Sequence, residues 1–258
     1  MPWRTMNKSA SFLYPDWPAP ANIGAAMTLR VGGVSAPPFA SFNQATHVGD
    51  DSVAVANNRL LTRQTLALPN EPVWLEQIHS NRVVDAINTS VLQQADASYT
   101  GQVGVVCAVL TADCLPLLIC SKEGQQVAAV HAGWKGLLAG IITNTITALN
   151  AARSKSAEES GYLVWLGSAI GPKSFEVGTE VREAFIHKNA RNSAAFLQTA
   201  ADKWLADIYQ LARIELTDLQ VVDVYGGGAC TFSEAELYYS YRREMQTGRM
   251  ASLIWRKS

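Results

Sequence analysis

Residues 103–136 read VGVVCAVLTADCLPLLICSKEGQQVAAVHAGWKG and combine three apolar runs with a glycine-rich turn. The first two runs are almost wholly apolar, which is typical of strands that are covered on both faces. The three runs predict strands over Val105–Leu110, Leu115–Cys120 and Gln126–Val130. The turn after His131 leads into a long amphipathic helix, predicted from Leu137 to about Arg153. Buried strands followed by a covering helix indicate an α/β fold.

The rest of the chain alternates strands and helices in the same way. Further helices are predicted over Val53–Leu66, Glu180–Lys188 and Ala200–Ile214. Further strands are predicted over Val73–Ile78, Leu163–Ile170, Leu219–Val224, Leu237–Tyr241 and Ala251–Trp255, and surface loops over Gly32–Phe39 and Lys155–Ser160. Because no break in composition divides the 258 residues, we expect a single α/β domain over residues 1–258.

Composition narrows the class of protein. The chain has 21 Lys+Arg against 22 Asp+Glu, a net charge of −1, which argues against nucleic acid or an anionic membrane as a partner. None of its four cysteines forms a CxxC pair, so a disulfide framework or a zinc ribbon is not expected. No signal peptide is recognised, and we therefore expect a cytoplasmic protein.

Val103–Cys120 is long enough to span a membrane, but its sequence favours another structure. Asp113 and Pro116 lie near its middle, and β-branched residues flank them. Two buried strands joined at a bend account for this pattern better than a membrane helix does.

The scarce histidines and cysteines gather at strand ends. His79 follows one predicted strand, Cys114 lies at the bend between two more, and His131 ends the next. Side chains from neighbouring strand ends can converge at one edge of a sheet. Two imidazoles and one thiolate form a good zinc set, and three protein ligands describe a catalytic site with an open fourth position.

Two other interpretations use the same residues. Cys114 could be a nucleophile activated by an imidazole, with Asp113 orienting a histidine. Alternatively, Cys114 is a buried structural cysteine beside two hydrogen-bonded histidines, and Asp113 caps a strand end. The sequence alone does not separate a thiolate ligand from a thiolate nucleophile.

Several cations could bind an anion. The turn at 131–136 places Lys135 beside a predicted helix N-terminus, which favours phosphate, although a plain strand-to-helix turn is the alternative. Arg242, Arg243 and Arg249 lie close together near the end of the chain, either for phosphate or carboxylate binding or as charges on a solvated edge strand. Cys107 and Cys120 lie inside apolar runs and are expected in the core.

Taken together, a series of motifs resembles the YfiH family, also called the laccase-domain or multicopper-oxidase-like family and linked to purine nucleoside phosphorylase activity. The motifs span about residues 28–254. In chain order they are Arg30-Val-Gly-Gly-Val-Ser, Asn43 with His47-Val-Gly-Asp50, Asn58-Arg59, Gln77-Ile-His79-Ser, Ala112-Asp113-Cys114-Leu-Pro116, His131-Ala-Gly-Trp-Lys-Gly136, Gly171-Pro172 with Phe175-Glu-Val-Gly178, and Ser240-Tyr-Arg-Arg243 with Gly248-Arg-Met250.

The resemblance implies a single domain of layered mixed β-sheets and helices, a YfiH-like, cysteine-hydrolase-type fold. It also implies a zinc site at the matching His79, Cys114 and His131. The implied activities are phosphorolysis of adenosine, inosine, guanosine and methylthioadenosine, and deamination of adenosine. Some relatives are described as copper-dependent polyphenol oxidases, and others as editing factors for peptidoglycan precursors.

Counting histidines weighs against the oxidase. Four-copper chemistry needs many imidazoles, usually in His-x-His pairs, and this chain has four histidines and no such pair. Zinc fits deamination directly, because it activates water for attack on the purine, with Asp113 as a candidate acid or base. For phosphorolysis, Asn43, Arg59, Lys135 and Arg243 are the candidates for holding substrate or phosphate. The expected partners are thus a nucleoside and phosphate, copper is the less favoured metal, and a monomer is the favoured state.

Overall fold

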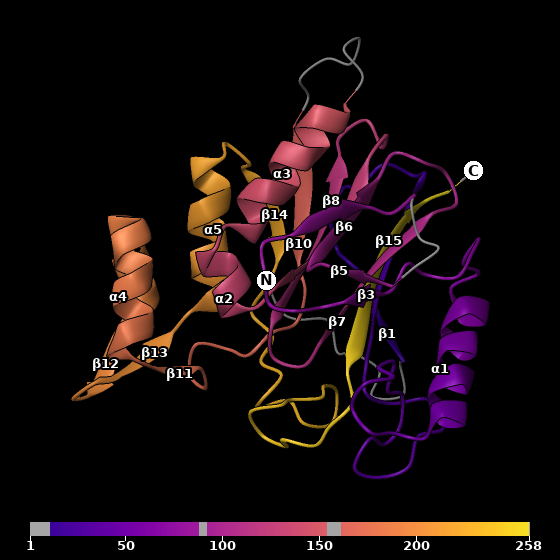
Figure 1. Cartoon of the computed structure of the whole chain (residues 1–258), viewed down its shortest axis with the longest axis horizontal. Coiled ribbons are helices and arrows are strands. Elements are labelled where there is room, and N and C mark those ends of the chain that lie inside the picture. The colour runs from indigo at the N-terminus through magenta and orange to yellow at the C-terminus, as the bar shows by residue number, and fades with distance from the viewer. Residues whose placement is uncertain (1–10, 88–91, 154–160, 258) are drawn as a thin grey trace.

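Two β-sheets stacked face to face form the centre of the computed structural model, which describes residues 11–87, 92–153 and 161–257 (Figure 1). One sheet has four strands in the order β1-β2-β15-β7, and the other has six in the order β14-β10-β8-β9-β6-β4. The four-stranded sheet, antiparallel throughout, consists of β1 (Phe12–Leu13), β2 (Ile23–Thr28), β15 (Met250–Arg256) and β7 (Val106–Thr111). The six-stranded sheet is mixed and consists of β14 (Asp223–Gly226), β10 (Tyr162–Leu166), β8 (Leu115–Ser121), β9 (Val127–Ala132), β6 (Ala97–Thr100) and β4 (Val83–Asp85).

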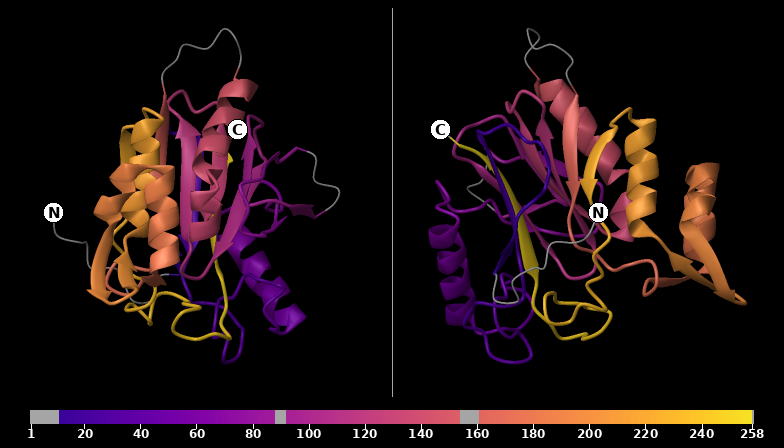
Figure 2. Two further views of the ribbon diagram at one scale, coloured as in Figure 1. Left: turned by 60° about the vertical axis from the view of Figure 1, so that its left-hand side comes forward. Right: turned by 180° about the vertical axis from the view of Figure 1, so that it is seen from behind.

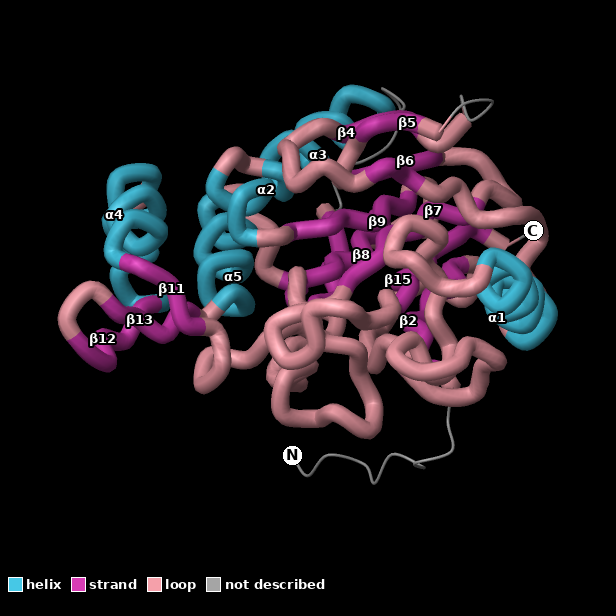
Figure 3. Tube along the Cα trace, turned by 60° about the horizontal axis from the view of Figure 1, so that its bottom comes forward, coloured by secondary structure: helices cyan, strands magenta, loops and turns pink. Residues whose placement is uncertain are grey.

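Helices cover the outer faces of this pair of sheets. Three of them, α2 (Trp134–Leu138), α3 (Ile141–Ala152) and α5 (Ile208–Asp218), lie over the six-stranded sheet, and α1 (Ser52–Thr65) lies beside the four-stranded one (Figure 3). The strand β8 is buried on both faces: Leu117 packs toward the helices, whereas Leu118 packs between the two sheets. This double burial is why β8 and its neighbours are apolar without alternation.

A separate projection extends from one side of the sheets (Figure 2). It consists of the three-stranded sheet β11-β13-β12 with one α-helix and one 3₁₀ helix. Its elements are β11 (Glu176–Gly178), α4 (Thr179–Lys188), η1 (Ala190–Ala195), β12 (Phe196–Ala200) and β13 (Lys203–Ala206). A short pair, β3 (Leu75–Glu76) and β5 (Gln93–Gln94), completes the elements.

The predicted fold class is confirmed, and the corrections concern single elements. The helix predicted over 137–153 is two helices, because Gly140 adopts a left-handed φ of 87° between them. The helix predicted over 200–214 is wrong in its first half, where β13 precedes α5. The strand predicted over 237–241 is wrong, since the segment consists of turns and irregular chain. The loop predicted over 155–160 lies outside the described residues.

The apolar run at 103–120 forms β7 and β8, joined at a bend as predicted. No helix in the described ranges is long and apolar enough to cross a membrane.

Candidate metal centre

Three strand ends bring His79, Cys114 and His131 together, as the sequence predicts. His79 follows β3, and Cys114 lies in the turn between β7 and β8. His131 lies near the end of β9 and pairs with Pro116 of β8. The ligand atoms of these three residues all lie within 4.8 Å of one another. We refer to the three as the His–Cys–His cluster. It lies at the edge where β7 ends and β8 and β15 begin.

The cluster fits a zinc ion. Cys114 Sγ lies 3.9 Å from His79 Nε2, and the two imidazole rings meet edge to face at 4.8 Å between centroids. Ligand atoms around tetrahedral zinc lie roughly 3.3–3.6 Å apart, close to the 3.9 Å between Cys114 Sγ and His79 Nε2. His131 is buried and His79 is exposed, so one side of the cluster faces solvent.

Asp96, which the sequence analysis missed, organises the cluster. Its Oδ1 lies 2.8 Å from His131 Nδ1 and accepts the His79 backbone N–H at 3.0 Å. Its Oδ2 accepts the Ser80 backbone N–H at 2.6 Å and the Ser80 hydroxyl at 2.7 Å. Burial acts to raise the pKa of the Asp96 carboxyl, but the bonds from His131 and Ser80 hold it below its usual value. The pairing at Nδ1 leaves His131 Nε2 as the nitrogen for a metal.

The cluster also favours a charged sulfur. Burial acts to raise the pKa of the Cys114 thiol, but the neighbouring imidazoles outweigh burial and lower it to about 6. Burial acts to lower the pKa of His131, but the Cys114 charge and the bond to Asp96 raise it to about 9. A thiolate is required both of a metal ligand and of a nucleophile, so the chemistry of Cys114 stays open between the two.

Backbone geometry makes room for the three side chains. His79 and Asp113 both adopt left-handed conformations, with φ of 57° and 88°, which are uncommon for residues other than glycine. Gly133 also leaves space for the cluster, because a Cβ at this position would lie 3.0 Å from Cys114 Sγ and 3.0 Å from His79 Cδ2. The glycine of the 131–136 turn is thus needed for close approach to the cluster.

The Asp113 carboxylate contacts the C-terminal loop, and these contacts argue against an acid–base role. One oxygen accepts the Thr231 hydroxyl at 2.6 Å, and the other accepts the Arg242 backbone N–H at 2.6 Å. Both oxygens are therefore engaged in fixing a loop beside Cys114. This arrangement favours a structural role over the predicted role as a catalytic acid or base.

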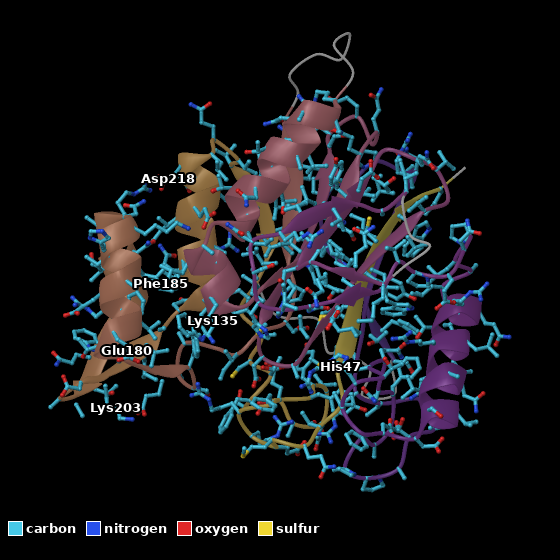
Figure 4. All side chains as sticks on the ribbon, viewed as in Figure 1. His47, Lys135, Glu180, Phe185, Lys203 and Asp218 are labelled. Carbon is cyan, nitrogen blue, oxygen red and sulfur yellow. The ribbon has the colours of Figure 1, made fainter. Side chains whose placement is uncertain are left out.

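Two of the predicted phosphate-binding cations lie in unfavourable positions. Arg243 donates to the backbone carbonyls of Thr231, Phe232 and Tyr238, which favours a loop-holding role. Lys135 is exposed on α2, with its ammonium group 5.7 Å from the centre of the Trp134 ring (Figure 4).

The other two predicted residues, Asn43 and Arg59, lie in one network with Arg249. Asn43 is buried and its Oδ1 accepts the Arg249 backbone N–H at 2.9 Å, while Arg59 Nε donates to the Gln44 carbonyl at 3.0 Å. The sequence analysis placed Arg249 only within a group of arginines. Its signal was the motif Gly248-Arg-Met250 at the start of β15.

The remaining predicted features have structural roles. Cys107 and Cys120 are fully buried, as expected of core residues, and burial raises the pKa of each thiol to about 12.

Comparisons with known proteins identify the family of this chain. The family model described as multi-copper polyphenol oxidoreductase laccase matches residues 24–257. The purine nucleoside phosphorylase YfiH of Escherichia coli is 47% identical over 247 residues, covering 95% of this chain and 99% of that protein. A purine nucleoside phosphorylase of Pseudomonas aeruginosa is 49% identical over 246 residues, covering 95% and 98%.

Solved structures show the same fold. The crystal structure of a Neisseria meningitidis protein superposes with a TM-score of 0.89 at 45% identity, covering 96% of this chain and 100% of that one. YlmD from Geobacillus stearothermophilus gives a TM-score of 0.89 at 29% identity, covering 97% of both chains. The YfiH resemblance is thereby confirmed, and the chain belongs to the family described as multi-copper polyphenol oxidoreductase laccase.

Proposed function

We propose that this protein is a zinc-dependent purine nucleoside phosphorylase whose active site is the His–Cys–His cluster. The observation that carries the proposal is an open three-ligand cluster in a chain whose near-full-length relatives are named purine nucleoside phosphorylase. The proposed substrates are adenosine, inosine, guanosine and methylthioadenosine. A structural zinc normally takes four protein ligands, so a set of three supports a catalytic zinc over a purely structural one.

The proposed reaction joins phosphate to the ribose of the nucleoside. A phosphate oxygen forms a bond to C1′ while the bond from C1′ to the purine nitrogen breaks, and its electron pair leaves with the base. The proton of hydrogen phosphate ends on the released base, so atoms and charge balance. A bound zinc ion would supply Lewis-acid chemistry at this site.

The protein's own residues prepare that site. Asp96 fixes the orientation of His131, and the left-handed turn at His79 directs the second imidazole toward Cys114. The hydrogen bonds that Asp113 accepts from Thr231 and Arg242 hold the C-terminal loop beside the cluster. Cations near the cluster would then balance the charge of phosphate.

We propose deamination of adenosine as a second activity of the same site. Water adds to the purine C6, one of its two protons goes to the amino group, and the C6–N bond breaks to release ammonia; the other proton ends on N1 of the inosine product. The exposed side of the cluster next to His79 gives water access, which supports this proposal.

A rival function is hydrolysis of another small molecule, such as a cell-wall precursor, by Cys114 as nucleophile. The low pKa of Cys114 beside the raised pKa of His131 is the observation that favours it. Copper chemistry has less support: the family description names copper, but the chain has only four histidines.

The proposal is tested by quantifying metal in the purified protein and measuring base release from adenosine and inosine with and without phosphate. We expect about one zinc per chain, phosphate-dependent release of base and ammonia release from adenosine. Release of no base under either condition would overturn the phosphorylase. A stoichiometric copper content with oxidation of a phenol would support the oxidase instead.

A further inference from the structure

Arg59 and Arg249, which are far apart in sequence, both form hydrogen bonds with the buried segment Asn43–Gln44. Arg59 of α1 donates its Nε to the carbonyl of Gln44 at 3.0 Å. Arg249, directly before β15, has its carbonyl bonded to the Gln44 N–H at 3.2 Å and its own N–H bonded to Asn43 Oδ1 at 2.9 Å. We refer to Arg59 and Arg249 as the arginine pair.

The arginine pair carries positive charge that no carboxylate of the described residues neutralises at contact distance. Neither guanidinium takes part in the ion pairs within 4.0 Å among those residues. Arg249 Nη1 donates to the carbonyls of Thr247 and Gly248, and the Arg59 guanidinium lies 4.0 Å from the centre of the Trp74 ring. Half-buried, unpaired guanidinium groups are costly, and an oxyanion bound by both would offset this cost.

Arg249 also connects the pair to the cluster. Burial lowers the pKa of its guanidinium, while the nearby charges of Cys114 and Asp113 act to raise it. The strand register agrees with this placement, because Met250, the residue after Arg249, pairs with Thr111 at the end of β7, three residues before Cys114.

His47 completes the group from the loop after Gln44. Its side chain lies near the start of β15, which Arg249 directly precedes (Figure 4). Partial burial and the positive charges of Arg249 and Arg59 act to lower the pKa of its imidazole. A neutral imidazole can still donate one N–H to an anion.

We infer that Arg249, Arg59 and His47 form the subsite for the inorganic phosphate of the proposed reaction, on the β15 side of the His–Cys–His cluster. The inference rests on the proposed phosphorylase function. This location differs from the phosphate site predicted at the Lys135 turn. Lys135 is an exposed residue of the five-residue helix α2, whereas His47 lies near the start of β15 (Figure 4). Two forks of guanidinium N–H donors suit the oxygens of phosphate.

The test uses the zinc-loaded full chain with inorganic phosphate as the probe. The variants are Arg249→Gln and Arg59→Ala, with Arg63→Ala as the control. Arg63 is on the same helix as Arg59 but forms a surface ion pair with Glu71. The dissociation constant of phosphate is measured by calorimetry, and KM is measured separately for phosphate and for inosine.

We expect Arg249→Gln and Arg59→Ala to weaken phosphate binding and raise KM for phosphate about 10- to 100-fold. KM for inosine and the zinc content should stay within twofold of the wild type, and Arg63→Ala should bind phosphate normally. If Arg249→Gln fails to fold, Arg249→Lys, which keeps the charge but loses the fork, should give a smaller loss in the same parameter.

The outcomes separate this inference from the proposed function. Phosphate binding that depends on Arg249, without any base release, would support the subsite and overturn the phosphorylase. Base release that is unaffected by either arginine variant would overturn the subsite alone. Loss of phosphate binding in Lys135→Ala rather than in Arg249→Gln, or no phosphate binding by the wild type, would also overturn it.

Discussion

One carboxylate, that of Asp96, holds both histidines of the cluster. It contacts His131 through the imidazole and His79 through the backbone N–H, and it fixes the adjacent turn through Ser80. Since the His79 turn is left-handed, these bonds also stabilise an otherwise unfavourable backbone conformation. Asp96 is therefore a positioning residue for the three side chains that would hold a metal.

Replacing Asp96 by Asn should weaken zinc binding about 10- to 100-fold, because the amide no longer offers two charged acceptor oxygens to the ligands. Competition with a chromogenic chelator measures this affinity. Asp85→Asn is the matched control, since among the described residues its carboxylate accepts one hydrogen bond, from the nearby Ile87 N–H. Equal zinc affinity in the two variants would remove the positioning role from Asp96.

Cys114 distinguishes the two interpretations of the cluster. If its thiolate is a metal ligand, Cys114→Ala should lose bound zinc together with base release. Elemental analysis and the phosphorolysis assay measure both, with Cys120→Ala in the neighbouring strand as the control that keeps zinc. Zinc retained at full occupancy with turnover abolished, or a covalent adduct trapped on Cys114 of the wild type, would instead support a nucleophile.

The convergence of His79, Cys114 and His131 could be predicted from the sequence because histidine and cysteine are scarce in this chain and fall at strand ends. The role of Asp96 could not be predicted, because a single aspartate before a strand has no distinctive local pattern. Arg243 and Arg249 are neighbours in sequence, and their roles depend on where β15 begins. Both donate to loop carbonyls, but Arg249 directly precedes β15, whose first residue pairs with Thr111 close to Cys114.

At the scale of elements, long-range strand pairing explains the errors in the predicted secondary structure. Residues 203–206 have a helix-compatible composition, but they pair with β11 and β12 and form β13. Asp207 then accepts the Gln210 N–H and caps α5, a signal that could have placed the helix start correctly. Local pattern was sufficient for α1, where no such pairing competes.

The junction of β9 and α2 supports the cluster through Gly133. Gly133→Ala should reduce zinc occupancy and activity, because the added Cβ would press on Cys114 Sγ and His79 Cδ2 at 3.0 Å. The change in unfolding free energy should stay near 1 kcal/mol, since the helix keeps its other contacts. Zinc titration and urea unfolding measure the two effects.

Gly101→Ala is the control for that change. A Cβ at Gly101 would have only the Gln125 carbonyl as a neighbour, at an ordinary 3.5 Å. We expect this variant to bind zinc as the wild type does. Full zinc occupancy in Gly133→Ala would show that the cluster tolerates a side chain there, contrary to the close approach described above.

At the scale of the whole molecule, the site depends on how the two sheets are assembled. The four-stranded sheet joins β2 and β15 from opposite ends of the chain, and β7 pairs with β15 next to the cluster. Cys114 then connects β7 of this sheet with β8 of the other. The spacing of the ligands is therefore set by the packing between the sheets as well as by the loops.

Leu118 tests that packing. Its side chain is fully buried between the sheets, so Leu118→Ala should lower the unfolding free energy by about 2–5 kcal/mol in urea titrations. Leu197→Ala is the matched control: Leu197 is 67% exposed on β12, and its loss should change stability by less than about 0.5 kcal/mol. Because β8 begins directly after Cys114, the core variant should also bind zinc more weakly while still folded, whereas the control should not. Unchanged zinc affinity in a destabilised but folded Leu118→Ala protein would mean that the loops alone hold the cluster.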